Sequence, residues 1–183
     1  MHKNFKILLL TKKIFSEKIL EWYSDHRRDL PWRKTKDPYK VWVSEIILQQ
    51  TRVDQGLPYY QKFIKAFPNV KALAAANQEV VLRLWQGLGY YSRARNMHRC
   101  AMQVTSEYKG SFPQQASALK KLTGIGDYTA AAISSICFNE PAAVVDGNVY
   151  RVLSRVFGIT TPINSTEGKK EFRSEEHTSE LQS

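Results

Sequence analysis

A glycine-containing turn between two apolar helical stretches, at residues 122–126, constrains this 183-residue chain more than any other feature. The turn reads Leu-Thr-Gly-Ile-Gly and is followed closely by an alanine-rich stretch from Thr129 to Phe138. Glycine lets the backbone turn tightly and approach a ligand closely, and the first turn of a helix has free backbone N–H groups. A turn built on Gly124 and Gly126 is therefore suited to hold a phosphate group.

Helical periodicity runs through the rest of the chain, and no alternating segment of convincing strand length interrupts it. Apolar residues repeat at helical spacing from Ile14 to Asp25, and Asp37 followed by Pro38 supplies an N-cap and a first-position proline for a second helix from about Tyr39. The predicted fold class is therefore all-α. Further helices are predicted at residues 53–67, 70–76, 78–85, 90–108, 117–122, 129–138 and 147–157.

The charge of the chain favours an anionic partner. Lysine and arginine number 27 against 17 aspartates and glutamates, which gives a formal net charge of +10 at pH 7. Such a balance is typical of nucleic-acid binding, although many basic proteins bind no nucleic acid. Hydrophobic residues make up 43% of the chain, enough for a core, which argues against intrinsic disorder.

The chain shows no feature of a membrane protein or of a metal site. Its longest apolar run near the start, Ile7 to Leu10, is far shorter than a signal-peptide core or a membrane span, so we expect a cytoplasmic protein with no membrane partner. We also expect a monomer. Cys100 and Cys137 each stand in an apolar helical pattern. They are interpreted as buried reduced thiols, and the two cannot form a complete metal site.

Two carboxylates are candidates for chemistry. Asp146 stands between an apolar run and Gly147, where a short loop exposes one carboxylate, and it is also well placed to cap the helix that follows. The glycine turn and Asp146 together suggest a DNA-acting protein. The backbone of the turn would hold the DNA, and the carboxylic acid of Asp146 would assist the reaction. Glu45 lies on the second predicted helix, where by itself it is as readily a solvated surface residue.

Several segments match one known family in order along the chain. They are Leu30-Pro-Trp-Arg33, Tyr39 to Thr51, Leu84 to Asn96, Leu122 to Gly126 and Asp146-Gly-Asn148. Together they resemble the adenine DNA glycosylases, the MutY family of the helix-hairpin-helix DNA glycosylase superfamily, over about 15–168. The resemblance implies the helix-hairpin-helix glycosylase fold, incomplete at its C-terminal end. It also implies excision of adenine mispaired with 8-oxoguanine or guanine in double-stranded DNA.

The resemblance assigns different roles to three residues. Glu45 matches the family's general acid, which protonates the leaving adenine at N7 and later helps to activate water. Asp146 matches the carboxylate that stabilises the sugar cation through a transient covalent adduct. Tyr128 stands where endonuclease III-like lyases carry a lysine that forms a Schiff base, which tyrosine cannot form. The chain is therefore predicted to be a monofunctional glycosylase, with Tyr128 near Asp146 to assist the cation.

Further residues match positions at which the family contacts DNA. Gln50 and Tyr90 match the residues that wedge into the duplex when adenine flips out, and Gln49 and Asn148 are additional DNA-binding candidates. Gly124 and Gly126 match the hairpin amides that grip the phosphate backbone without reading bases.

The pocket for the flipped base and the basic helix are assigned less directly. Trp32 and Arg33 match pocket residues near the base, although Trp32 is equally suited to the core. Arg93, Arg95 and Arg99 follow Tyr90 on one predicted helix, and they are either phosphate contacts or a solvated basic face.

The resemblance also implies parts that this sequence does not contain. Relatives continue into a loop of four cysteines that binds a [4Fe–4S] cluster and into a C-terminal domain that recognises 8-oxoguanine, and neither Cys100 nor Cys137 matches a cluster ligand. We expect the apolar face around Phe15, Leu20 and Trp22 to be partly uncovered for this reason. Residues 173–183 resemble the translation of a sequencing adaptor, or else form a natural polar tail.

The predicted organisation has four parts. They are an N-terminal helix of the incomplete cluster-side subdomain at 1–28, a helical barrel subdomain at 29–145 with the helix-hairpin-helix at about 117–138, the start of the C-terminal part of the catalytic domain at 146–172, and the adaptor-derived tail at 173–183. Two alternative functions remain. One is an endonuclease III-like bifunctional glycosylase/lyase, which Tyr128 disfavours, and the other is a non-catalytic helix-hairpin-helix DNA-binding fragment, which would not need Glu45.

Overall fold

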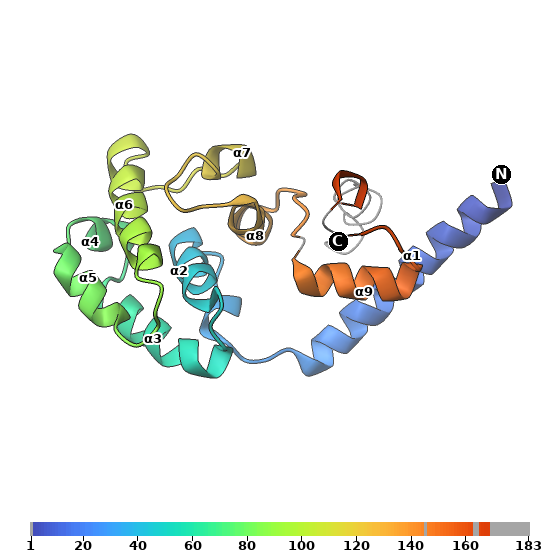
Figure 1. Cartoon of the computed structure of the whole chain (residues 1–183), viewed down its shortest axis with the longest axis horizontal. Helices are drawn as coiled ribbons and strands as arrows, with labels where there is room; N and C mark the ends of the chain where they lie inside the picture. The colour runs from blue at the N-terminus through green and yellow to red at the C-terminus, as the bar shows by residue number, and fades with distance from the viewer. Residues whose placement is uncertain (1, 145, 163–164, 169–183) are drawn as a thin grey trace. The chain divides into compact units, whose positions relative to one another are not determined.

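The structure is a computed structural model that describes residues 2–144, 146–162 and 165–168, with side chains described from residue 14 onward. The described residues form helices and loops without a strand, which confirms the predicted all-α class (Figure 1). The tail predicted at 173–183 lies outside the described residues. None of the described helices is long and apolar enough to cross a membrane.

The chain divides into two compact units, Leu30–Glu140 and the combination of Met1–Asp29 with Pro141–Ser183. The larger unit consists of a single 3-10 turn and seven α-helices. These are η1 (Pro31–Arg33), α2 (Pro38–Leu48), α3 (Val53–Ala66), α4 (Val70–Ala74), α5 (Gln78–Trp85), α6 (Ser92–Glu107), α7 (Ala116–Leu119) and α8 (Asp127–Phe138).

Side-chain caps fix where several of these helices begin. The Asp37 carboxylate accepts a hydrogen bond from the Tyr39 N–H at 3.0 Å, which confirms the predicted cap of α2. Asn77 likewise accepts from the Glu79 N–H at 2.7 Å and confirms the predicted start of α5. Asn69 caps α4 by accepting from the Ala72 N–H at 2.9 Å.

Helix α2 runs through the core of the larger unit and packs against α3 and α8. It is apolar on nearly all sides, and a helix of this kind is stable only when it is surrounded by other elements. Its Trp42, Val43 and Ile47 are at most 1% exposed. Glu45 is therefore a carboxylic acid side chain on a largely buried helix. Helix α6 packs against α4 and α5 at another side of the core (Figure 1).

The smaller unit is built on α1 (His2–His26) and α9 (Gly147–Phe157). The Phe15 and Phe157 rings meet edge to face, with centroids 5.4 Å apart. Leu20 and Trp22 on α1 are 49% and 59% exposed, which confirms the expectation of a partly uncovered apolar face. Gly158, with φ of +65°, ends α9 in the left-handed conformation that glycine adopts without strain.

Candidate active site

Glu45 and Tyr128 lie together in the larger unit. Burial of the Glu45 side chain raises the pKa of its carboxyl above the usual value, and a hydrogen bond with Tyr128 partly offsets this rise. Tyr128 stands in the first turn of α8, which packs against α2, and its side chain remains 41% exposed. A raised pKa keeps the carboxyl protonated to higher pH, which suits a group that donates a proton.

Asp146 belongs to the smaller unit, where it caps α9. One carboxylate oxygen accepts hydrogen bonds from the backbone N–H groups of Asn148 and Val149, at 2.8 and 2.9 Å. The other oxygen accepts from the Asn148 side-chain amide nitrogen at 3.1 Å, and the side-chain oxygen of Asn148 accepts from Arg151. These hydrogen bonds hold the Asp146 side chain in one orientation at the start of α9. That Tyr128 lies near Asp146 stays a prediction.

The two glycines of the hairpin between α7 and α8 have different structural roles. Gly124 has φ of +78°, and an added Cβ would lie 2.8 Å from the Cβ of Asn96, so both conformation and packing require glycine. Gly126 precedes α8, and an added Cβ there would have no heavy atom within 4 Å. Leu122 and Ile125 anchor the turn in the core at 2% and 5% exposure. The outer side of the hairpin is therefore open at Gly126, beside the first turn of α8.

Helix α6 supports the hairpin from beneath through a contact that the sequence did not reveal. The Thr123 N–H donates to the side-chain oxygen of Gln103 at 3.0 Å, and the Thr123 hydroxyl lies 3.3 Å from the same oxygen. No periodicity or motif marks Gln103, because one amide on a helix surface carries no sequence signal of its distant partner.

Gln50 and Tyr90, the predicted wedge residues, share an uncommon backbone conformation. Their φ angles are +56° and +46°, in the left-handed region that residues other than glycine rarely adopt. Each such conformation costs on the order of 1–3 kcal/mol and persists only where the surroundings enforce it. Both side chains are exposed, and that of Tyr90 is 66% exposed.

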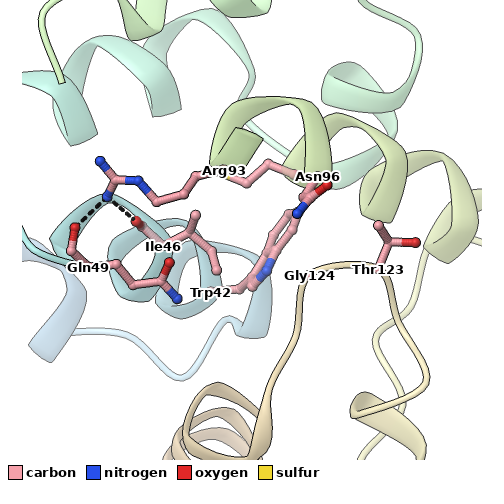
Figure 2. A pocket seen from close by; sticks show the side chains of 8 residues that line it. Trp42, Ile46, Gln49, Arg93, Asn96, Thr123 and Gly124 are labelled. Carbon is pink, nitrogen blue, oxygen red and sulfur yellow. Dashed lines mark hydrogen bonds between the residues drawn. The ribbon is translucent and has the colours of Figure 1, made fainter. Parts of the chain in front are cut away.

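Arg93, in the first turn of α6, binds backbone carbonyls next to both residues. Its guanidinium donates to the carbonyl oxygens of Ile46, Ile47 and Gln49, and Figure 2 shows it directed at the end of α2. It also donates to those of Leu88 and Gly89. The interpretation of Arg93 as a phosphate contact is therefore wrong, because both of its Nη groups bond backbone carbonyl oxygens and its Nε is buried. Arg95 and Arg99 are exposed on the same helix.

A small hollow connects these elements (Figure 2). It encloses ≈ 270 Å³, open solvent at its mouth included, and lies between the end of α2, the start of α6 and the hairpin. The structure thus brings Gln49, a predicted DNA contact, into the same hollow as Gly124. The lining residues are Trp42, Ile46, Gln49, Arg93, Asn96, Met97, Thr123 and Gly124.

Trp32 and Arg33, the predicted base-pocket residues, lie on η1. Trp32 is 8% exposed and packs edge to face on Tyr60, with ring centroids 5.0 Å apart, so it contributes to the core. Arg33 is exposed. Their role in a base pocket stays a prediction.

The two cysteines do not fit a [4Fe–4S] cluster, which is held by four thiolates. Both thiols are free, and burial raises the pKa of Cys100 to about 12 and that of Cys137 to about 11. A raised pKa disfavours the thiolate that iron binds. Within the described part of the chain, no three His, Cys, Asp or Glu side chains gather where they could hold a metal ion.

Comparison with known proteins gives one consistent family. The model of the HhH-GPD superfamily of base excision DNA repair proteins matches residues 43–177. A protein of Buchnera aphidicola subsp. Acyrthosiphon pisum named adenine DNA glycosylase is 49% identical over 152 residues, covering 82% of this chain and 43% of its own length. The human protein of the same name is 44% identical over 161 residues, covering 83% and 30%. The chain thus spans less than half the length of these relatives.

Two solved structures share the fold. A thermostable thymine-DNA glycosylase superposes with a TM-score of 0.81 at 27% identity, over 93% of this chain and 84% of that one. A non-covalent endonuclease III–DNA complex gives a TM-score of 0.73 at 18% identity, over 99% of this chain and 84% of the other, a likeness of fold alone.

Proposed function

Because the chain belongs to the HhH-GPD superfamily of base excision DNA repair proteins, we propose that it is the catalytic region of an adenine DNA glycosylase. Its substrate is adenine opposite 8-oxoguanine or guanine in duplex DNA, and it hydrolyses the N-glycosidic bond. The observation that carries the proposal is the pairing of Glu45, whose carboxyl has a raised pKa, with Tyr128 at the end of the hairpin. The name shared by the relatives supports adenine as the base.

The proposed reaction begins with proton transfer from the Glu45 carboxyl to N7 of adenine. The bond between N9 and the sugar C1′ then breaks, and its electron pair leaves with the neutral base. Asp146, held in place by its hydrogen bonds at the start of α9, stabilises the cation that forms at C1′. Glu45, now ionised, accepts a proton from the water that attacks C1′. No step passes through an iron–sulfur cluster.

DNA binding is proposed to use two surfaces of the larger unit. The open side of the hairpin, at Gly126 and the first turn of α8, offers backbone N–H groups to a phosphate. Gln50 and Tyr90 enter the base stack beside the flipped adenine, where an amide and an aromatic ring can replace lost hydrogen bonds and stacking. Asn148, Trp32 and Arg33 are kept as further proposed contacts of the DNA or the base.

Single-turnover excision on defined duplexes tests this function. We expect free adenine from duplexes with adenine opposite 8-oxoguanine or guanine, and little from adenine opposite thymine. A duplex with thymine opposite guanine is the control, because a structural neighbour is named thymine-DNA glycosylase. If no duplex releases adenine while DNA is still bound, the non-catalytic binding alternative is favoured. Release of thymine alone would give the chain a different substrate.

Absence of lyase chemistry is the second expected result, because Tyr128 has no amine to form a Schiff base. Reduction with borohydride during turnover should trap no covalent protein–DNA complex, and strand cleavage should need added alkali. Tyr128→Lys is the matched positive control, since it places an amine at this position and should become trappable. A strong complex with the unchanged protein would favour the endonuclease III-like alternative.

A further inference from the structure

One arginine side chain joins the two turns that carry the exposed residues Gln50 and Tyr90. From the start of α6, the Arg93 guanidinium Nη1 lies 3.0 Å from the Ile46 carbonyl oxygen and 3.2 Å from that of Ile47. Its Nη2 lies 3.2 Å from the Leu88 carbonyl oxygen. The carbonyls at the end of a helix lack partners within the helix, and a cation there is favoured by the helix dipole. Arg93 therefore completes the end of α2 and binds a second turn at once.

The bonds of Arg93 fall directly before the two strained residues. Nη1 lies 2.5 Å from the carbonyl oxygen of Gln49, which precedes Gln50, and Nη2 lies 3.5 Å from that of Gly89, which precedes Tyr90. In each case the bound peptide oxygen belongs to the peptide bond that leads into a residue with positive φ. One rigid, planar group thus restrains both left-handed conformations.

Two aromatic rings pack against the guanidinium of Arg93. It lies 5.1 Å from the centroid of the Trp85 ring and 5.7 Å from that of the Tyr90 ring. The Trp85 indole N–H also donates to the Gly89 carbonyl oxygen at 3.0 Å. Trp85 is fully buried, whereas Tyr90 is mostly exposed, so the rigid core extends through Arg93 to an exposed ring.

We propose that Arg93 is a positioning residue that sets Gln50 and Tyr90 as a pair, at fixed spacing and orientation, for entry into the DNA base stack. This inference rests on the proposed function. Exposed side chains of amide and phenol type lose conformational freedom on insertion, and a prepositioned backbone reduces that loss. Arg93 contacts neither base nor sugar in this role, and its effect on DNA passes through the two residues that it restrains.

A double-mutant cycle measured without chemistry tests the proposal. Duplexes carry 2-aminopurine next to a 2′-fluoro-deoxyadenosine, whose glycosidic bond resists cleavage, so fluorescence reports insertion alone. Arg93→Lys keeps the charge but cannot bind two turns with one ammonium group. We expect Arg93→Lys to lower the equilibrium constant for insertion about tenfold when Gln50 and Tyr90 are present. The decrease should be less than about twofold when both residues are already replaced by alanine.

Controls separate this role from charge and from folding. Arg83→Lys, on the exposed side of α5, repeats the same substitution where we assign no contact and should leave insertion unchanged. The assays are run well below the melting temperature of every variant, and Arg93→Gln replaces Arg93→Lys in the cycle if the latter does not fold. Full insertion by Arg93→Lys, or an equal loss without the two side chains, would overturn the proposal. Adenine release by the unchanged protein is scored separately, so failure of the proposed function is seen independently.

Discussion

Glu45→Gln is expected to lower the rate of the proposed adenine excision by about 10²–10⁴-fold, the usual contribution of a general acid, while duplex binding stays close to that of the unchanged protein. Glutamine has nearly the same size and can still bond Tyr128, but it has no proton to give to adenine. Single-turnover excision and a binding titration with the same duplex measure the two effects. If cleavage is unchanged, Glu45 has no part in the mechanism.

The same substitution has a predicted effect on stability that depends on pH. Burial raises the pKa of Glu45 in the folded state, so the unfolded chain ionises first as pH increases, and the folded state loses stability as pH rises through the raised pKa. Glu45→Gln removes this loss. Its melting temperature should exceed that of the unchanged protein at neutral pH, and the gain should vanish below the ordinary pKa of glutamate. Glu79→Gln, at an exposed position on α5, is the control and should show no such gain.

Asp146 offers the second large effect, because its charge and its capping role can be separated. Asp146→Asn keeps a side-chain oxygen for the N–H groups of Asn148 and Val149 but removes the negative charge. Asparagine caps helices about as well as aspartate, so the melting temperature should hardly change. Excision should fall by about 10²–10³-fold, the scale of a lost electrostatic stabiliser of the transition state.

Two further variants complete the Asp146 comparison. Asp146→Ala should lose excision and also about 0.5–2 kcal/mol of stability, because the cap of α9 is gone. Asn77→Ala removes a similar cap from α5, where Asn77 accepts from the Glu79 N–H, and should lose stability without losing excision. Thermal melting and single-turnover assays on all three proteins separate the roles. Normal excision by Asp146→Asn would contradict a catalytic charge at this position.

Local sequence chemistry predicted the helices well where a cap or breaker was present. Asp37 and Asn77 marked the starts of α2 and α5, and α9 has the predicted ends at Gly147 and Phe157. Helical periodicity supported the first helix only from Ile14 to Asp25, whereas α1 begins at His2, and no glycine or proline interrupts residues 2–13. The 3-10 turn η1 was missed since three residues are too few to show a period.

In the candidate site, too, features that depend on local sequence were predicted, and features that depend on distant contacts were not. Glu45, Tyr128 and the hairpin were predicted from motifs, and the raised pKa of Glu45 depends on packing by surrounding helices that a motif does not describe. Arg93 was misinterpreted because a long basic side chain can reach carbonyls on two distant segments, and the sequence spacing carries no sign of them. The positive φ of Gln50 and Tyr90 was equally hidden, since neither residue type favours it.

Helix α6 sets the distance between two parts of the proposed DNA interface. Arg93, at the start of α6, bonds the turns that carry Gln50 and Tyr90. Gln103, ten residues later, bonds the hairpin at Thr123. At 1.5 Å per residue, this separation is about 15 Å of nearly incompressible helix, comparable to roughly four nucleotide steps along one strand. One residue inserted between Arg93 and Gln103 would lengthen their separation by about 1.5 Å. It would also rotate Gln103 by about 100° around the helix axis, away from the hairpin. The length of α6 therefore fixes how far the turns that carry Gln50 and Tyr90 lie from the hairpin.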